Sequence, residues 1–155
     1  MSGLDAFEIG HRADLGTYTF TPEAIIAFAR KFDPQPFHLD EEAARHTMLG
    51  ALCASGWHTT AVWMKKNIEY RDRWLAELEA SGKQAPVMGP SPGFRNLKWL
   101  RPVYAGDTIR YFNTFLSARQ RKTKPEWGIV ELNSEGFNQN GEQVIAFDSA
   151  VLVRI

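Results

Sequence analysis

An aspartate and a histidine lie five positions apart in a segment that two prolines stiffen. Asp33 and His38 belong to residues 32–40, which read F-D-P-Q-P-F-H-L-D. Pro34 and Pro36 each fix their own φ at about −65° and restrict the residue before them, so we predict a stiff extended loop instead of a helix. A carboxylate and an imidazole at a fixed separation suit acid–base chemistry, in which one group holds or deprotonates a water and the other handles a second proton.

The same two residues also suit a structural role. An aspartate between a helix and a proline is often a turn residue, and a nearby histidine is often a surface or packing residue. Loops on rigid scaffolds nevertheless carry many functional groups. The motif alone leaves both interpretations of Asp33 and His38 open.

A second candidate site stands at Ser55 and Gly56, in a segment of small residues where we expect a buried helix to begin. Free backbone N–H groups at a helix N-terminus stabilise negative charge, such as the charge that develops on a carbonyl oxygen. Removing one donor of this kind typically costs about 3 kcal/mol of transition-state stabilisation. The alternative is that Gly56 only allows a helix to pack closely on a sheet.

The elements that must position these residues begin with helices. Thr21 and Pro22 form a typical helix start, and Pro34 should end that helix near Phe32. One apolar face follows at helical spacing: Ile25, Phe28, Ala29 and Phe32. Asp40 is a suitable cap for a short helix over residues 41–44.

A longer helix is predicted to begin near Ser55 and to end at Ser81-Gly82. Residues 50–62 are nearly uncharged, which favours a buried start. Residues 65–79 are strongly charged and should face solvent or a partner. The expected apolar positions keep helical spacing: Trp57, Ala61, Met64, Ile68, Leu75 and Leu78.

Strand patterns fill the second half of the chain. They cover residues 94–103, 109–116, 127–133 and 144–153, after a Pro- and Gly-rich loop at residues 84–93. The last strand is apolar on both faces and should be central in its sheet. Asn140-Gly141 predicts a tight hairpin and Gly106-Asp107 a turn. Helices followed by strands predict an α+β fold, with a curved antiparallel sheet around the long helix.

Composition limits the class of protein. The 155 residues suit one domain, 1–155, and the formal net charge of zero lacks the basic excess of a nucleic-acid binder. No apolar run approaches the about 18 residues of a membrane span, and we expect no secretory leader at the N-terminus. Because Cys53 is the lone cysteine, it forms no intrachain disulfide, and a reducing cytoplasm is the simpler location.

The other candidate ligands and nucleophiles match no known site pattern. The spacings of His38, Asp40, His46, Cys53 and His58 match no zinc pattern, so we expect no metal. The single thiol is interpreted as a small buried hydrophobe. The S-G-W sequence lacks the G-x-S-x-G elbow of a serine hydrolase.

Three ordered motifs resemble those of the MaoC-like hydratase/dehydratase family. Residues 33–40 are similar to its D-x-N-P-x-H-x-D, residues 50–56 to its G-x-x-I-A-H-G, and residues 100–109 to its R-P-V-x-x-G-D-T. The resemblance runs from about Tyr18 to Ile155. Gln35 stands where the family has Asn, and Ser55 where it commonly has His. The stretch 68–93 is longer than in compact members, which affects acyl-chain specificity first.

The resemblance implies a hot-dog fold and reversible hydration of a 2-enoyl thioester, usually on coenzyme A, to an (R)-3-hydroxyacyl product. It implies that Asp33 and His38 grip the reacting water, with His38 taking its proton and Asp33 exchanging the C2 proton or orienting the water. Gly56, with Ser55 beside it, would bind the thioester oxygen. The implied reaction needs no metal or redox cofactor, and the implied assembly is a homodimer or a higher even-numbered homo-oligomer.

Two other functions fit the same fold. A hot-dog thioesterase would use a carboxylate to activate water against the thioester carbonyl. A non-catalytic hot-dog subunit would bind an acyl group on coenzyme A or a carrier protein, or another protein. In every case the predicted partner is an acyl thioester, with no nucleic acid and no membrane.

Overall fold

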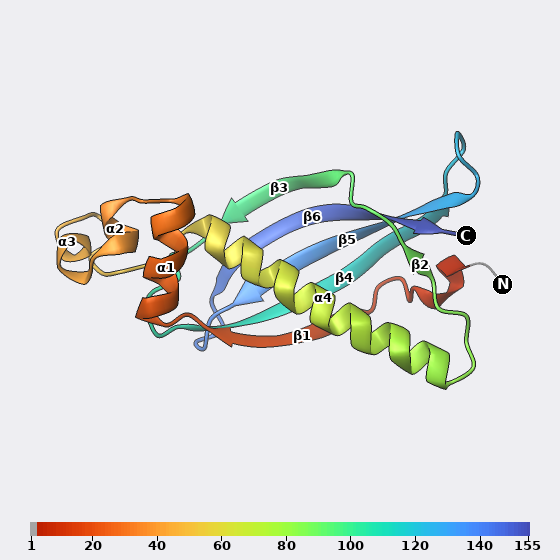
Figure 1. Ribbon diagram of the computed structural model, residues 1–155, viewed down its shortest axis with the longest axis horizontal. Helices are drawn as coiled ribbons and strands as arrows, with labels where there is room; N and C mark the ends of the chain where they lie inside the picture. Colours follow the sequence, from red (N-terminus) through yellow and green to blue (C-terminus); the bar gives the residue numbers. More distant parts are fainter. Residues whose placement is uncertain (1–2) are drawn as a thin grey trace.

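The protein is described by a computed structural model covering residues 3–155. Met1 and Ser2 lie outside the described residues. The predicted domain and the N-terminal segment in which no leader is expected both begin with these two residues. Figure 1 shows the elements in order: η1 (Gly3–Ala6), β1 (Arg12–Thr19), α1 (Pro22–Phe32), α2 (Pro36–Leu39), α3 (Glu41–Arg45), α4 (Gly56–Ala80), β2 (Val87–Met88), β3 (Gly93–Trp99), β4 (Thr108–Gln120), β5 (Trp127–Phe137) and β6 (Gln143–Arg154).

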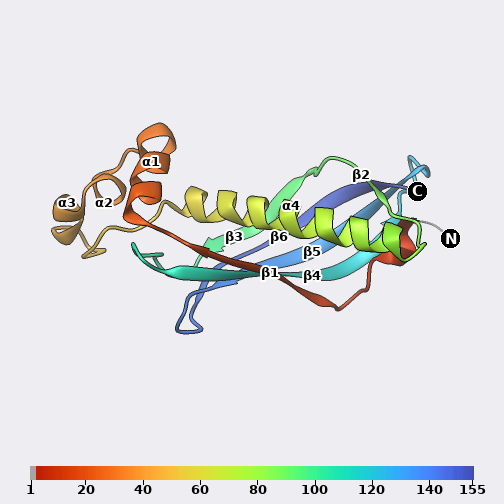
Figure 2. The same cartoon turned by 60° about the horizontal axis from the view of Figure 1, so that its bottom comes forward.

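The strands form one six-stranded antiparallel sheet in the order β1-β4-β5-β6-β2, with β3 also paired to β6. The sheet curves along α4, and α1, α2 and α3 gather beyond one end of it, next to the first turn of α4 (Figures 1 and 2). The predicted α+β hot-dog architecture is confirmed. The last strand, β6, is central as predicted. It pairs with β5 on one side, and with both β2 and β3 on the other.

The helix boundaries agree with the local signals. Thr21 Oγ1 accepts a hydrogen bond from Ala24 N at 3.2 Å, and α1 ends at Phe32 as predicted. The buried face of α1 contains Ile25 and Ala29, but the prediction for Phe32 is wrong, because this ring is 69% exposed and lies against Phe28, with ring centroids 5.0 Å apart. A terminal residue of a helix that projects beyond the sheet has little core to meet.

The long helix begins at Ser55 and ends at Ser81-Gly82 as predicted, and Leu78 is buried as predicted, but the buried side of its first turns differs. The side chains that face the sheet are His58, Thr59, Val62 and Trp63. Trp57 and Met64, from the predicted apolar stripe, remain 50% and 46% exposed. An uncharged helix start therefore does not mean burial on all sides: α4 places one face on the sheet and leaves a second apolar face uncovered.

Two polar contacts fix α4 on the sheet. The buried Tyr111 hydroxyl of β4 donates to Thr59 O at 2.8 Å, and Trp63 Nε1 donates to Asn113 Oδ1 at 2.9 Å. Buried polar groups with partners define a unique placement, since each unpaired group would cost about 1–3 kcal/mol. These contacts set the position of the first turns of α4, which carry the candidate site.

The sequence pattern missed strand β1. Its inward residues Ala13 and Leu15 alternate with polar ones for only a few positions. The register of the pairing with β4 then shifts between Asp14 and Gly16. Gly16 has a φ of +92°, a region that favours glycine, and its N–H donates to Asp14 Oδ1 at 2.9 Å. This bulge interrupts the period of two by which a strand is recognised. The short strand β2, inside the predicted loop 84–93, was also missed.

Candidate active site

The segment after α1 brings Asp33 and His38 together. The prediction of a continuous extended loop is only partly right, because Pro36 begins the short helix α2, which carries His38. A proline is accepted at the first helical position, where its missing N–H has no helical partner to lose. Asp33 Oδ2 lies 3.3 Å from His38 Nε2, so the two side chains converge as the motif suggested.

The hydrogen bond made by His38 Nδ1 shows which ring nitrogen carries the hydrogen. Nδ1 lies 2.7 Å from the backbone carbonyl of Cys53. A carbonyl oxygen only accepts, so Nδ1 carries the hydrogen, and in the neutral ring Nε2 is left as a base. The side chain of His38 is 8% exposed and that of Asp33 is 17% exposed. The base therefore faces the carboxylate in a largely enclosed space.

Asp33 is held in its charged form. Burial alone would raise its pKa, but hydrogen bonds from Gln35 and Ser55 and the positive charge of His38 outweigh it, and the pKa lies below its ordinary value. The Gln35 contact is short, with Nε2 donating to Asp33 Oδ1 at 2.6 Å. Gln35, the departure from the family motif, thus contacts the candidate acid–base pair directly.

Ser55 and Gly56 form the N-terminus of α4 beside this pair. Ser55 is fully buried, its Oγ accepts from Trp57 N at 3.3 Å, and its carbonyl accepts from His58 N and Thr59 N. Within residues 3–155, the Gly56 N–H has no protein acceptor. An amide of this kind at a helix N-terminus is a donor for a developing anion.

Glycine is favoured at position 56 by a contact that the sequence did not signal. A Cβ built there would overlap Cδ2 and Cε2 of the Trp99 indole and lie 2.8 Å from its Cε3. Trp99 comes from β3, packs edge-on against Trp57 and donates from Nε1 to Thr60 Oγ1 at 3.2 Å. The close-packing interpretation of Gly56 is therefore correct, and it is compatible with a free N–H.

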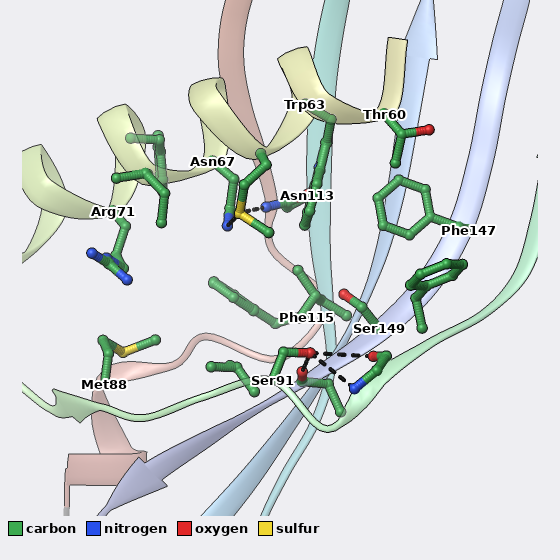
Figure 3. A pocket seen from close by; sticks show the side chains of 18 of the residues that line it. Thr60, Trp63, Asn67, Arg71, Met88, Ser91, Asn113, Phe115, Phe147 and Ser149 are labelled. Atoms are coloured by element: carbon green, nitrogen blue, oxygen red, sulfur yellow. Dashed lines mark hydrogen bonds between the residues drawn. The ribbon is translucent and has the colours of Figure 1, made fainter. Parts of the chain in front are cut away.

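A small cavity of about 220 Å³ lies beside the candidate pair, and of the two residues His38 lines it while Asp33 does not. His38 and Gly56 line it together with Cys53, Thr59 and Trp99, so the imidazole and the helix amide face one space. A larger cavity of about 610 Å³ lies between α4 and the strands β2, β3 and β6 (Figure 3). Neither Asp33 nor His38 lines this larger space.

His46 and His58 make their contacts elsewhere, whereas the Cys53 thiol lies beside the pair, with its Sγ 3.7 Å from His38 Nδ1. His46 is exposed beside Glu42, and His58 stacks on Phe28 with ring centroids 4.6 Å apart. Burial lowers the pKa of His58 to about 4, whereas burial and the charge of Asp33 raise the pKa of the Cys53 thiol to about 11. In residues 3–155, no three metal-ligating side chains gather at one point.

The fold and the candidate site define a hot-dog protein of the MaoC type. The family model "MaoC like domain" matches residues 7–133, and the chain belongs to this family. It is similar to the solved MaoC-like dehydratase from Rhodospirillum rubrum, with 36% identity, coverage of 97% of this chain and 95% of that one, and a TM-score of 0.79.

Two curated relatives were also found. The protein YdeM of Bacillus subtilis is 27% identical over 154 residues, which cover 97% of this chain and 98% of that protein. The mesaconyl-CoA hydratase of Cereibacter sphaeroides is 34% identical over 62 residues, which cover 40% of this chain and 18% of the hydratase. The second likeness is local.

Among the described helices, none has the length and apolar character needed to cross a membrane.

Proposed function

We propose that the protein catalyses the reversible hydration of a 2-enoyl thioester, on coenzyme A or a carrier protein, to a 3-hydroxyacyl thioester. The observation that carries this proposal is the 3.3 Å approach of His38 Nε2 to the Asp33 carboxylate, whose pKa is lowered, beside a Gly56 amide that has no acceptor within residues 3–155. Membership of a hydratase and dehydratase family supports the same reaction class.

The protonation states suggest how the two residues divide the work. A resting Asp33 carboxylate has no proton to give, so it accepts a hydrogen bond from the water and orients it. His38 Nε2 takes one proton as the water oxygen bonds to C3 of the enoyl group. The electron pair of the double bond shifts toward the thioester oxygen, and the Gly56 N–H stabilises that charge. The imidazolium then delivers its proton to C2, and the sum is addition of one water.

A homodimer is the proposed assembly. The edge formed by β2 and β3 exposes Val87, Phe94 and Trp99. The opposite edge, β1, exposes mainly polar groups. An unpaired edge with large apolar side chains favours pairing with a second copy. Sedimentation at several concentrations tests this, and a monomer throughout would contradict it.

The reaction is tested by following two signals in one sample. Purified protein is mixed with 2-butenoyl-CoA, and the conjugated enoyl absorbance and the free thiol are measured together, with chromatography of the product against (R)- and (S)-3-hydroxybutyryl-CoA. We expect absorbance to fall with no thiol release and the (R)-product to form. Stoichiometric thiol release would instead support a thioesterase. Binding without any chemical change would support an acyl-binding subunit.

A further inference from the structure

The larger cavity has an unusual charge distribution. It measures about 610 Å³, within the range of small-molecule sites, and its walls are mainly apolar and aromatic, with Trp63, Phe94, Phe115, Phe147 and Val151 among them. Of the residues described, 3–155, Arg71 is the one charged residue that lines it. An apolar space with a single cation at its wall suits a ligand that is mostly hydrocarbon and carries one anionic group.

Arg71 has capacity for such a group. Its Nε and Nη2 both lie near one oxygen of the neighbouring Asp72, at 3.3 and 3.2 Å, and Nη1 has no acceptor within residues 3–155. The Asp72 side chain is 62% exposed, and an exposed pair of this kind is weak. Figure 3 shows Arg71 projecting from α4 toward the cavity, with Met88 facing it from the strand below.

Asn67 lies one helical turn before Arg71 and also faces the cavity. Its Oδ1 accepts from Asn113 Nδ2 at 2.9 Å (Figure 3), and Asn113 Oδ1 in turn accepts from Trp63 Nε1 and Ser134 Oγ. This network fixes the orientation of the Asn67 amide. Its Nδ2 meets only the sulfur of Met64 at 3.9 Å, a weak acceptor, so an N–H donor remains for an oxygen of a ligand.

We propose that this cavity holds the acyl chain of a long 2-enoyl thioester whose far end carries a carboxylate, bound by Arg71 and Asn67. The inference rests on the proposed hydratase function. Along α4, Asn67 and Arg71 lie about 16 and 22 Å beyond Gly56 at 1.5 Å per residue. An extended alkyl chain advances about 1.3 Å per carbon from its bond lengths, so a chain of roughly 12–17 carbons spans this distance.

The two cavities are lined by neighbouring residues in the first turns of α4. Gly56 and Thr59 line the small cavity, while Trp57 and Thr60 line the large one. The Trp99 indole lies at the boundary, since it lines the small cavity and donates to Thr60. Because 45% of its surface is exposed, the indole can turn toward solvent, and this movement would let a chain pass from the side of the candidate pair into the larger space.

The test compares acyl chains that differ only at the far end. Binding of hexadecanedioyl-CoA and hexadecanoyl-CoA, which cannot be hydrated, is measured by calorimetry, and kcat/KM is measured for the corresponding 2-enoyl pair. We expect the carboxylated chain to be preferred roughly 10–100-fold in both measurements, as for a charge-assisted hydrogen bond. In Arg71→Met the preference for the carboxylated chain should fall toward one. In Asn67→Leu it should fall to an intermediate value.

Two controls make the result specific. Arg73→Met removes an exposed arginine of the same helix that does not line the cavity, and it should retain the full preference. A pair of chains of about eight carbons, too short to reach Asn67, should show no preference. Loss of the preference in Arg73→Met, or its retention in Arg71→Met, would overturn the proposal.

Failure of this inference is distinguishable from failure of the hydratase function. Hydration of 2-butenoyl-CoA without any preference for the carboxylated long chain would refute only the assignment of the cavity. Preferential binding of hexadecanedioyl-CoA without hydration of any enoyl-CoA would refute the reaction and keep the binding site. If a second copy fills the cavity, Arg71→Met will change the dimer dissociation constant while neither long chain is favoured, and the proposal is then wrong.

Discussion

Replacing Gly56 with alanine adds one methyl group directly under the Trp99 indole. Two ring atoms, Cδ2 and Cε2, would overlap the new Cβ, and a third, Cε3, would be 2.8 Å away. Carbon atoms in contact need about 3.5 Å, so the indole must retreat by roughly 1 Å. The ring then weakens its hydrogen bond to Thr60 and its edge contact with Trp57.

The expected cost follows from these contacts. A neutral hydrogen bond contributes about 0.5–1.5 kcal/mol, and an aromatic pair contributes a similar amount. Alanine returns up to about 1 kcal/mol through its better helix propensity. Because Trp99 is half-exposed on β3 and can move without disturbing the core, we expect Gly56→Ala to lower the free energy of unfolding by about 1–2 kcal/mol.

The assay is urea unfolding at one fixed protein concentration, followed by tryptophan fluorescence and circular dichroism. Gly56→Ala is compared in the native background and in Trp99→Ala, where the obstructing ring is gone. In the second background alanine should cost nothing or stabilise slightly, giving a coupling energy of about 1–2 kcal/mol. Equal destabilisation in both backgrounds would refute the view that Trp99 is the reason for glycine.

Two further predictions concern pH. The pKa of His58 is about 4 in the folded protein, below its ordinary value of 6.5. Between these two values the unfolded chain binds a proton that the folded protein does not. The free energy of unfolding therefore falls as the pH drops from 6.5 toward 4, by up to about 3 kcal/mol. His58→Phe, which keeps an aromatic ring against Phe28, should flatten this part of the stability profile measured by urea titration; an unchanged slope would mean that other groups cause it. Removing the Gln35 donor in Gln35→Leu should raise the Asp33 pKa and shift the acidic limb of kcat/KM for 2-butenoyl-CoA to higher pH, with Gln35→Glu as the charged comparison. An acidic limb that stays in place would show that Gln35 does not tune the carboxylate.

Features set by neighbouring residues could be predicted from the sequence. The caps at Thr21, Asp40 and Ser55 lie where the side chains predicted them, since each accepts from an amide two or three positions ahead. The left-handed turns at Gly106 and Gly141 follow from the same local chemistry. The convergence of Asp33 and His38 was also local, because two prolines limit the paths between them.

Features that depend on distant partners could not be predicted. Trp99 lies 43 positions after Gly56, and nothing in its own strand indicates that it covers that glycine. The Cys53 carbonyl that assigns the His38 proton is a backbone group and leaves no signature in residue types. The buried face of the first turns of α4 was misassigned because this part of the helix has two apolar stripes, and only the sheet decides which one it covers.

The central claim is that Asp33 and His38 act as one unit on a single water. The most direct measurement is the initial rate of 2-butenoyl-CoA hydration by Asp33→Asn, His38→Gln and the double variant, with circular dichroism and oligomeric state confirmed for each. Each single change should lower kcat by about 10²–10⁴-fold, and the double variant should be little worse than the poorer single one. Native turnover in either folded single variant would contradict the assignment.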